Sequence, residues 1–245
     1  MSVGQETLQV SPAPGTSAAP LCQLCDARDL FLVLDLGWHP PSDGFVPPER
    51  LSEPDPRYPL TVVCCEACRL VQLREAVDPE LLFGDRFIYR SGFNEPLRQH
   101  LETIPEFVAG YRRLTPRDLA VDIGSNDGSL LKGYRPFGTR ILGVDPSIVA
   151  RIAIREGVPT LQTFFDEATA RRIREEHGGA AVISGTNVFA HVKELASLMA
   201  GVKLLLEDDG IFLTESHYLL DLVEQLQYDE IYLEHLRYYA VESLV

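Results

Sequence analysis

The stretch Val121–Ser129, VDIGSNDGS, decides the fold of this chain. An apolar strand runs here into a glycine turn, and acidic residues stand beside the turn. The next apolar segment, Ile141–Val144, ends directly in Asp145. A glycine turn lets the backbone approach a ligand, and an acid after the second strand can accept hydrogen bonds from ribose hydroxyls. The pairing therefore predicts a nucleotide-type site at the carboxyl ends of two parallel strands.

The composition of the turn indicates which ligand to expect. Dinucleotide folds use G-x-G-x-x-G so that a helix N-terminus can meet a pyrophosphate. Here only Gly124 and Gly128 are glycines, and Asp127 lies between them. An acid at that place would repel a pyrophosphate and would suit a ligand with positive charge, such as S-adenosylmethionine. The alternative is a tight strand–helix turn that binds nothing.

Length and charge exclude several classes of function. A chain of 245 residues can hold one large domain or two smaller ones, and its formal charge of −14 disfavours a nucleic-acid or anionic-membrane surface. No apolar run is long enough to span a membrane, and no secretory signal is evident. Residues 1–20 are small, polar and proline-rich, which is typical of a disordered tail. We therefore expect a cytoplasmic protein with reduced cysteines.

The cysteines predict a structural zinc site. All five lie in the first 68 residues, as the C-x-x-C pairs Cys22/Cys25 and Cys65/Cys68, with Cys64 directly before the second pair. Two such pairs can place four thiolates tetrahedrally around one Zn²⁺, which leaves no open position for chemistry. The proline- and aromatic-rich segment between the pairs would form a looped lobe pinned by the metal. A disulfide framework and a set of unrelated buried cysteines are the alternatives, and the role of Cys64 stays open.

The rest of the chain alternates strands and helices, after a linker helix that starts near Glu95. Such alternation predicts a mostly parallel sheet with right-handed crossovers and a ligand site at the carboxyl ends of its strands. The expected strands are 119–123, 141–144, 160–164, 180–184 and 210–215. The expected helices are 129–134, 147–156, 166–177 and 192–206.

The last segment, Leu219–Val245, carries several tyrosines close to Glu234 and His235. On spacing alone, a tyrosine stripe is more often packed in a core, and a histidine among tyrosines is more often held by hydrogen bonds than catalytic.

Taken in order, these motifs resemble the deoxysugar C-methyltransferases, which are S-adenosylmethionine-dependent enzymes with an N-terminal zinc lobe. The resemblance runs from Cys22 to the C-terminus, and any one of its motifs alone is modest evidence. It rests on the paired cysteines followed by CRLVQL, then on YRSGFNEPLRQH, DIGSNDGSLL, GVDPS, NVFAHV and YLLDLVEQLQYDEIYLEHLRYY.

The resemblance implies a class I methyltransferase fold of the α/β, Rossmann-like type, preceded by a small zinc-binding lobe. It divides the chain into a tail (1–20), a zinc-binding domain (21–75), a helical linker (76–117) and a methyltransferase domain (118–245). The chain ends near the point where the family's C-terminal sugar-nucleotide domain begins, so we expect that domain to be absent and the turnover of a sugar to be in doubt.

The resemblance also implies roles for individual residues. The cofactor-binding positions would be Gly124, Ser125, Asn126, Gly128, Asp145, Pro146, Asn187, Phe189 and Tyr89. In the acceptor motif, His235 would be the base, Glu234 its orienting partner and Tyr232 a group touching a keto sugar. Leu233 stands where the family pattern has a histidine, which puts the local hydrogen-bond network in doubt.

The implied reaction methylates a carbon next to the ketone of a nucleotide-linked 4-keto-deoxysugar, in deoxysugar and antibiotic biosynthesis. The base would remove the proton beside the ketone, and the stabilised enolate would attack the sulfonium methyl. We expect His235, held by a carboxylate, to have a pKa near neutrality. Two alternatives stay open, a methyltransferase of another small molecule and a catalytically silent, zinc-stabilised binding module. The sequence does not name the sugar or the oligomeric state.

Overall fold

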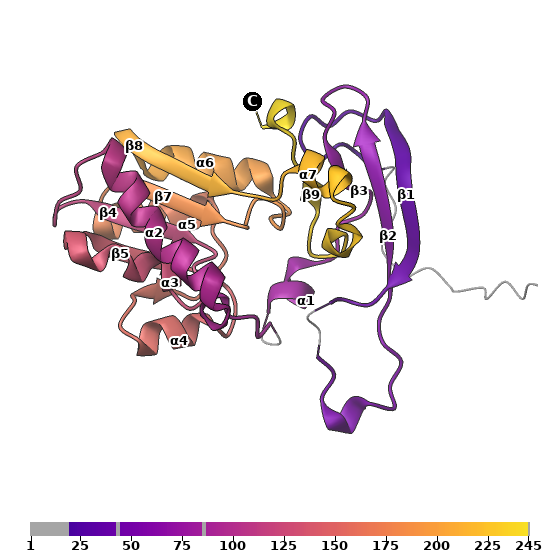
Figure 1. The fold of residues 1–245 in the computed structure, drawn as a ribbon, viewed down its shortest axis with the longest axis horizontal. Helices are drawn as coiled ribbons and strands as arrows, with labels where there is room; N and C mark the ends of the chain where they lie inside the picture. Colours follow the sequence, from indigo (N-terminus) through magenta and orange to yellow (C-terminus); the bar gives the residue numbers. More distant parts are fainter. Residues whose placement is uncertain (1–19, 43–44, 85–86, 245) are drawn as a thin grey trace, which may run out of the picture.

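The computed structural model describes residues 20–42, 45–84 and 87–244 and forms an α/β unit beside a smaller antiparallel lobe (Figure 1). The predicted tail lies outside the described residues except for Pro20. No helix of the described residues is long and apolar enough to cross a membrane.

The α/β unit is built on a five-stranded parallel sheet in the order β6-β5-β4-β7-β8. Its strands are β4 (Leu119–Ile123), β5 (Arg140–Val144), β6 (Thr160–Leu161), β7 (Ala180–Thr186) and β8 (Leu206–Glu215). The central strand β4 is buried along its whole length because helices cover both faces of the sheet.

The helices divide between the two faces of this sheet. Side chains of α2 (Glu95–Tyr111), α3 (Ser129–Lys132) and α4 (Ala150–Arg155) share one apolar cluster with Ala120 and Val182. The other face packs α5 (Glu167–His177) and α6 (Leu195–Leu205). Burying each large apolar side chain stabilises the unit by about 1.5–3 kcal/mol. The predicted class of fold and the order of its elements are therefore present.

Several predicted boundaries shift for local reasons. Asp166 caps α5 rather than starting it, since its side chain accepts a 2.7 Å hydrogen bond from the Thr169 backbone N–H. The second helix of the unit begins at Ala150 and not at Ser147, because the Ser147 side chain and N–H are both bound to Asp145. Strand β8 begins at Leu206, directly after α6.

The N-terminal lobe is a four-stranded antiparallel sheet in the order β1-β2-β3-β9. It comprises β1 (Leu30–His39), β2 (Tyr58–Cys65), β3 (Val71–Leu73) and β9 (Arg237–Tyr238). The sequence analysis expected the proline- and aromatic-rich segment between the cysteine pairs to be looped, but β1 occupies ten residues of the interval between those pairs. The register of β1 on β2 slips between Leu32 and Leu34 and again between Asp35 and Trp38, so the strand lacks a regular alternation.

The C-terminal segment crosses back to this lobe. Strand β9 pairs with β3, Val71 opposite Tyr238 and Gln72 opposite Arg237, and Figure 1 shows the yellow end of the chain against the lobe. Helix α7 (Leu219–Glu224) contributes Leu222 to an apolar cluster of the lobe. The segment that the sequence analysis assigned to the methyltransferase domain (118–245) thus finishes in the sheet of the zinc lobe. Helix α1 (Pro79–Phe83) lies between the two parts.

Candidate functional site

A cavity of about 1100 Å³ opens where the lobe meets the carboxyl ends of β4, β5 and β7. Both parts of the molecule line it, which is where ligands bind in open α/β sheets. The predicted residues that line this cavity are Tyr89, Gly124, Ser125, Asn126, Asp145, Pro146, Asn187, Tyr232, Glu234 and His235. Sequence segments far apart are therefore brought into one site.

The glycine turn after β4 needs the residue types that the sequence provides. Gly124 has φ +67°, and a Cβ there would lie 2.5 Å from the Val188 Cγ2 atom. Its backbone N–H donates a 2.8 Å hydrogen bond to the Val144 carbonyl, which fixes the turn against β5. Asn126 is also left-handed, with φ +52°. Residues other than glycine and asparagine are disfavoured in this left-handed backbone conformation.

Asp145 closes the other side of the turn. Its carboxylate is 5% exposed and accepts from the Asn126 N–H at 2.9 Å and from the Ser147 N–H at 2.9 Å. Each carboxylate oxygen can accept more than one hydrogen bond, and the residue lines the cavity. The carboxylate of Asp145 is therefore placed to accept further hydrogen bonds from the ribose hydroxyls of a nucleoside.

A second acid that lines the cavity lies near the glycine turn. Asp122, on β4, is buried and accepts a 2.6 Å hydrogen bond from the Ser184 hydroxyl. Burial raises the pKa of this carboxyl to about 7, and the nearby Asp145 adds to the increase. Asp122 is thus part of the acidic environment near the turn.

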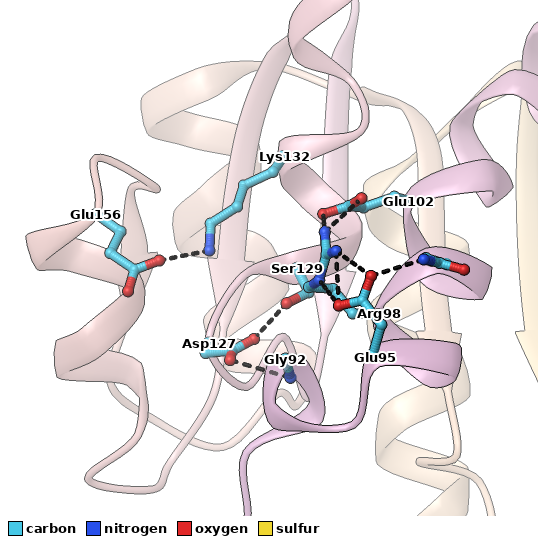
Figure 2. Close-up of polar contacts among 9 residues, drawn as sticks. Gly92, Glu95, Arg98, Glu102, Asp127, Ser129, Lys132 and Glu156 are labelled. Carbon is cyan, nitrogen blue, oxygen red and sulfur yellow. Dashed lines mark hydrogen bonds and ion pairs between the residues drawn. The ribbon is translucent and has the colours of Figure 1, made fainter.

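Asp127 does not do what the sequence analysis assigned to it. Its carboxylate accepts from the Ser129 hydroxyl at 2.7 Å and from the Gly92 N–H at 3.1 Å (Figure 2). The Arg90 Nε lies 3.4 Å from the same carboxylate. It is not among the residues that line the cavity. The argument that Asp127 faces a cationic ligand is therefore wrong, because this acid holds the segment before α2.

That segment lies against the cofactor turn. The Asn126 side chain accepts from the Ser91 N–H at 3.0 Å and donates to the Tyr89 carbonyl at 2.9 Å. Gly92 is confined because a Cβ there would lie 2.5 Å from the Asp127 Oδ2 atom. The contacts place the Tyr89 ring at the cavity, as the family resemblance implied.

Of three further predicted positions, one lines the cavity and two pack behind it. Asn187, with φ +55°, lines the cavity just after β7. Gly128 and Phe189 are not among the lining residues: a Cβ on Gly128 would meet Val158 at 3.0 Å, and Phe189 packs in the core beside Phe212. The latter two support the site from behind.

The end of the cavity at which the resemblance places the acceptor is centred on His235. The side chain is 2% exposed, its Nδ1 lies 2.9 Å from the Glu230 carbonyl, and its Nε2 lies 2.7 Å from the Tyr232 hydroxyl. Burial, with a smaller contribution from the neighbouring His217, lowers the pKa of His235 to about 4. The pKa is thus lower than the near-neutral value that the sequence analysis expected.

Glu234 ties the lobe to the site. Its Oε1 accepts a 2.9 Å hydrogen bond from the Ser42 N–H, and the side chain is buried. Leu233, where the family pattern has histidine, packs in the apolar cluster of the lobe.

Three further side chains, to which the sequence analysis assigned no role, surround His235. The ring centroids of His191 and His217 each lie 4.8 Å from that of His235, and the Glu230 Oε2 lies 3.2 Å from the His217 Nε2. All three residues line the cavity. His191 and His217 follow strands β7 and β8, which is a signal of a site, whereas no pattern marks Glu230.

The cavity is strongly acidic. Among the described residues that line it, Lys193 is the sole lysine or arginine. The lining carboxylates are Asp78, Glu80, Asp122, Asp145, Asp166, Glu194, Asp229, Glu230 and Glu234. This charge, and not Asp127, favours a cationic cofactor.

The cysteines of the lobe form the predicted tetrad. The Sγ atoms of Cys22, Cys25, Cys65 and Cys68 lie within 4.8 Å of one another, with 3.4 Å between Cys22 and Cys68 and 3.7 Å between Cys25 and Cys65. Four sulfurs around Zn²⁺ are about 3.8 Å apart. Although burial opposes it, hydrogen bonds from the Cys68 and Ala67 backbone lower the pKa of the Cys65 thiol to about 7. The four residues therefore fit a closed, structural Zn²⁺ site.

Cys64 lies outside this tetrad. Its side chain is buried, and its Sγ faces the carbonyls of Cys65 and Arg69 at 3.7 and 3.8 Å.

Comparison with known proteins agrees with both parts of this description. Residues 22–83 match a family described as a zinc binding domain, and residues 97–245 match a methyltransferase domain. The C-methyltransferase NovU of Streptomyces niveus is 33% identical over 224 residues, which are 91% of this chain and 53% of that protein. The chain thus spans about half the length of this relative.

A solved structure supports the fold alone. The S-adenosylmethionine-dependent methyltransferase from Archaeoglobus fulgidus matches with a TM-score of 0.50 at 14% identity, covering 60% of this chain and 65% of the other. The predicted class I methyltransferase fold and the zinc-binding lobe are confirmed by these matches.

Proposed function

Because this chain belongs to the methyltransferase domain family, we propose that it transfers the methyl group of S-adenosylmethionine to carbon. The acceptor in this proposal is the carbon beside the ketone of a nucleotide-linked 4-keto-deoxysugar. The observation that carries the proposal is that one cavity holds both the glycine turn and the buried His235. The division into zinc lobe, linker helix and methyltransferase domain is part of the same proposal.

The cofactor end would be held by groups already described. Asp145 would accept from the ribose hydroxyls, and the Gly124–Asn126 backbone would lie against the ligand. When bound, S-adenosylmethionine supplies an electrophilic methyl group on a positively charged sulfur. The many lining carboxylates would favour that charge over the neutral thioether product.

At the acceptor end, His235 would take the proton from the carbon beside the ketone. A carbonyl accepts but cannot donate, so the contact to Glu230 assigns the proton of neutral His235 to Nδ1 and leaves a lone pair on Nε2. With a low pKa the imidazole is neutral at pH 7 and can accept a proton, although it is a weaker base than an exposed histidine. The Tyr232 hydroxyl is hydrogen-bonded to Nε2 in this structure. With substrate bound it would turn to the ketone oxygen and stabilise the enolate.

The electrons balance without a further reactant. The proton of the C–H bond would pass to Nε2 of His235, and the electron pair of that bond would form the enolate. The enolate carbon that His235 generates would be the nucleophile for the methyl group that bound S-adenosylmethionine would supply, with the neutral thioether as the leaving group. Holding both reactants in one cavity lowers the barrier.

The assignment to carbon is supported by the name of the relative, a C-methyltransferase. The nucleotide-linked sugar rests on the motif resemblance. Since Lys193 is the single lining lysine or arginine of the described residues, we propose that the diphosphate of such a substrate is held by residues outside this cavity. We place the reaction in the cytoplasm, where the four thiolates stay reduced for zinc.

The acidic cavity also favours a second candidate, methylation of an uncharged or cationic small molecule. A panel of keto sugars with and without the nucleotide separates the two. Transfer to the free sugar at the same rate as to the linked one would favour the second.

Replacing the base tests the proposal directly. His235→Ala is expected to abolish methyl transfer and to leave the binding of S-adenosylhomocysteine nearly intact, because His235 lies at the acceptor end. An unchanged rate of transfer would remove His235 as the base. If neither form transfers a methyl group although both bind S-adenosylhomocysteine, a catalytically silent binding module becomes the better description.

A further inference from the structure

One carboxylate that faces two histidines stands directly beside the proposed base. The Glu230 Oε2 lies 3.2 Å from the His217 Nε2 and 3.8 Å from the His235 Nδ1. Glu230 and His217 come from different elements, a 3₁₀ turn at Tyr228–Glu230 and the segment after β8. The Glu230 side chain is 29% exposed, so its charge is only partly screened by water.

Glu230 acts on His235 in two ways. Its backbone carbonyl, 2.9 Å from Nδ1, fixes the tautomer whose free lone pair is on Nε2. Its carboxylate faces the same ring, so it favours the imidazolium that forms when the base takes a proton. The remaining titratable groups with rings against His235 are His191, Tyr232 and Tyr238.

His191 and Tyr238 do not supply a negative charge beside His235. Burial keeps His191 neutral by lowering its pKa to about 3, and it raises the pKa of Tyr238 above its ordinary value, which favours the neutral phenol. Tyr232 shares its hydroxyl with Nε2, the atom that would receive the proton. Glu234, the partner that the resemblance implied, accepts from the Ser42 N–H through Oε1.

We propose that Glu230 is a positioning residue for His235, which fixes its tautomer through the carbonyl and stabilises its protonated form through the carboxylate. His217 shares that carboxylate and so moderates the effect. The proposal rests on the proposed role of His235 as the base, but it is tested without turnover.

The same three side chains also have the spacing of metal ligands, with their ligand atoms within 4.8 Å of one another. Both ring nitrogens of His235 are engaged, however, Nδ1 with the carbonyl and Nε2 with Tyr232. A metal ion would have to displace one of these contacts, so the hydrogen-bonded arrangement is the one we infer.

The test is an NMR titration of the full, zinc-loaded chain labelled with ¹⁵N in histidine. It is made in a His217→Ala background, because His217 lowers the pKa of His235 and its removal is expected to raise that pKa. Adding Glu230→Gln keeps the carbonyl and the side-chain size. We expect the pKa of His235 to fall by about one unit and the Nδ1–H tautomer to persist.

Two further variants keep the test sharp. Glu224→Gln removes an equal charge from the exposed end of α7 and is expected to leave the pKa of His235 unchanged. Glu230→Asp, which only withdraws the carboxylate, is expected to lower it by less than Glu230→Gln and serves if the latter unfolds.

Three results would overturn the proposal. One is a pKa of His235 that falls no further in Glu230→Gln than in Glu224→Gln. Another is an Nε2–H tautomer in the neutral ring. The third is one equivalent of Co²⁺, added to the zinc-loaded chain without these substitutions, that broadens the His217 and His235 signals together. Since no acceptor is present, failure here is distinct from failure of methyl transfer.

Discussion

The glycine turn after β4 gives the most quantitative prediction. Gly124→Ala places a side chain on a residue with φ +67° and brings its Cβ within 2.5 Å of the Val188 Cγ2 atom. The left-handed backbone alone costs an alanine about 1–2 kcal/mol. The clash adds an over-packing cost of about 1–3 kcal/mol, which together is a large part of the stability of a domain.

A matched control separates the two costs. Gly138 also has φ +67°, but a Cβ there would meet Pro116 at 3.5 Å, an ordinary contact, and the residue is exposed. Gly138→Ala should therefore show only the backbone cost and unchanged affinity for S-adenosylhomocysteine. Gly124→Ala should lose more stability and weaken that affinity, since Val188 lines the cavity.

Chemical denaturation and calorimetric titration measure both effects. Adding Val188→Ala to Gly124→Ala should recover part of the lost affinity by removing the atom that clashes. The reasoning is refuted if Gly124→Ala and Gly138→Ala are equally destabilised and bind S-adenosylhomocysteine equally well.

The remaining predictions concern metal and pH. Cys65→Ser, or removal of zinc by a chelator, should unfold the lobe, because the tetrad joins its two ends. The control Cys64→Ser should retain one Zn²⁺ per chain, since Cys64 lies outside the tetrad. Equal zinc contents in the two variants, measured by atomic absorption, would contradict the tetrad. Asp122 has a pKa of about 7 when folded against about 3.9 when unfolded, so only the folded state holds this proton between those values. Stability should therefore fall as the pH rises from about 4 to 7, by at most about 4 kcal/mol from this group. The free energy of unfolding of Asp122→Asn, measured by urea denaturation, should therefore rise relative to that of the unsubstituted chain as the pH increases over this range. If the two free energies change in parallel with pH, the raised pKa of Asp122 is contradicted.

Local patterns predicted several residues that line the cavity at the strand ends. Gly124, Asp145 and Asn187 were found from the sequence because each stands at a strand end, and chain direction alone places the carboxyl ends of parallel strands together. The prediction for Asp127 was wrong because its partners come from the segment before α2, which no pattern in the turn reveals.

The acceptor half depends on contacts between distant residues. The low pKa of His235 arises from burial by segments that meet only in the folded chain, so the sequence could not supply it. Strand β9 has two residues and pairs with β3, more than 160 positions earlier, so it leaves no periodic signal. Strand β1 was missed because its two register slips break the alternation that marks a half-buried strand.

The most direct test of the cofactor site is calorimetric titration of the zinc-loaded, 245-residue chain with S-adenosylhomocysteine. We predict one site per chain with micromolar affinity, because the turn, Asp145 and the acidic cavity are all formed by this chain. A folded chain with one bound Zn²⁺ and no affinity for S-adenosylhomocysteine would contradict the proposed cofactor site, and with it the methyl transfer that depends on it.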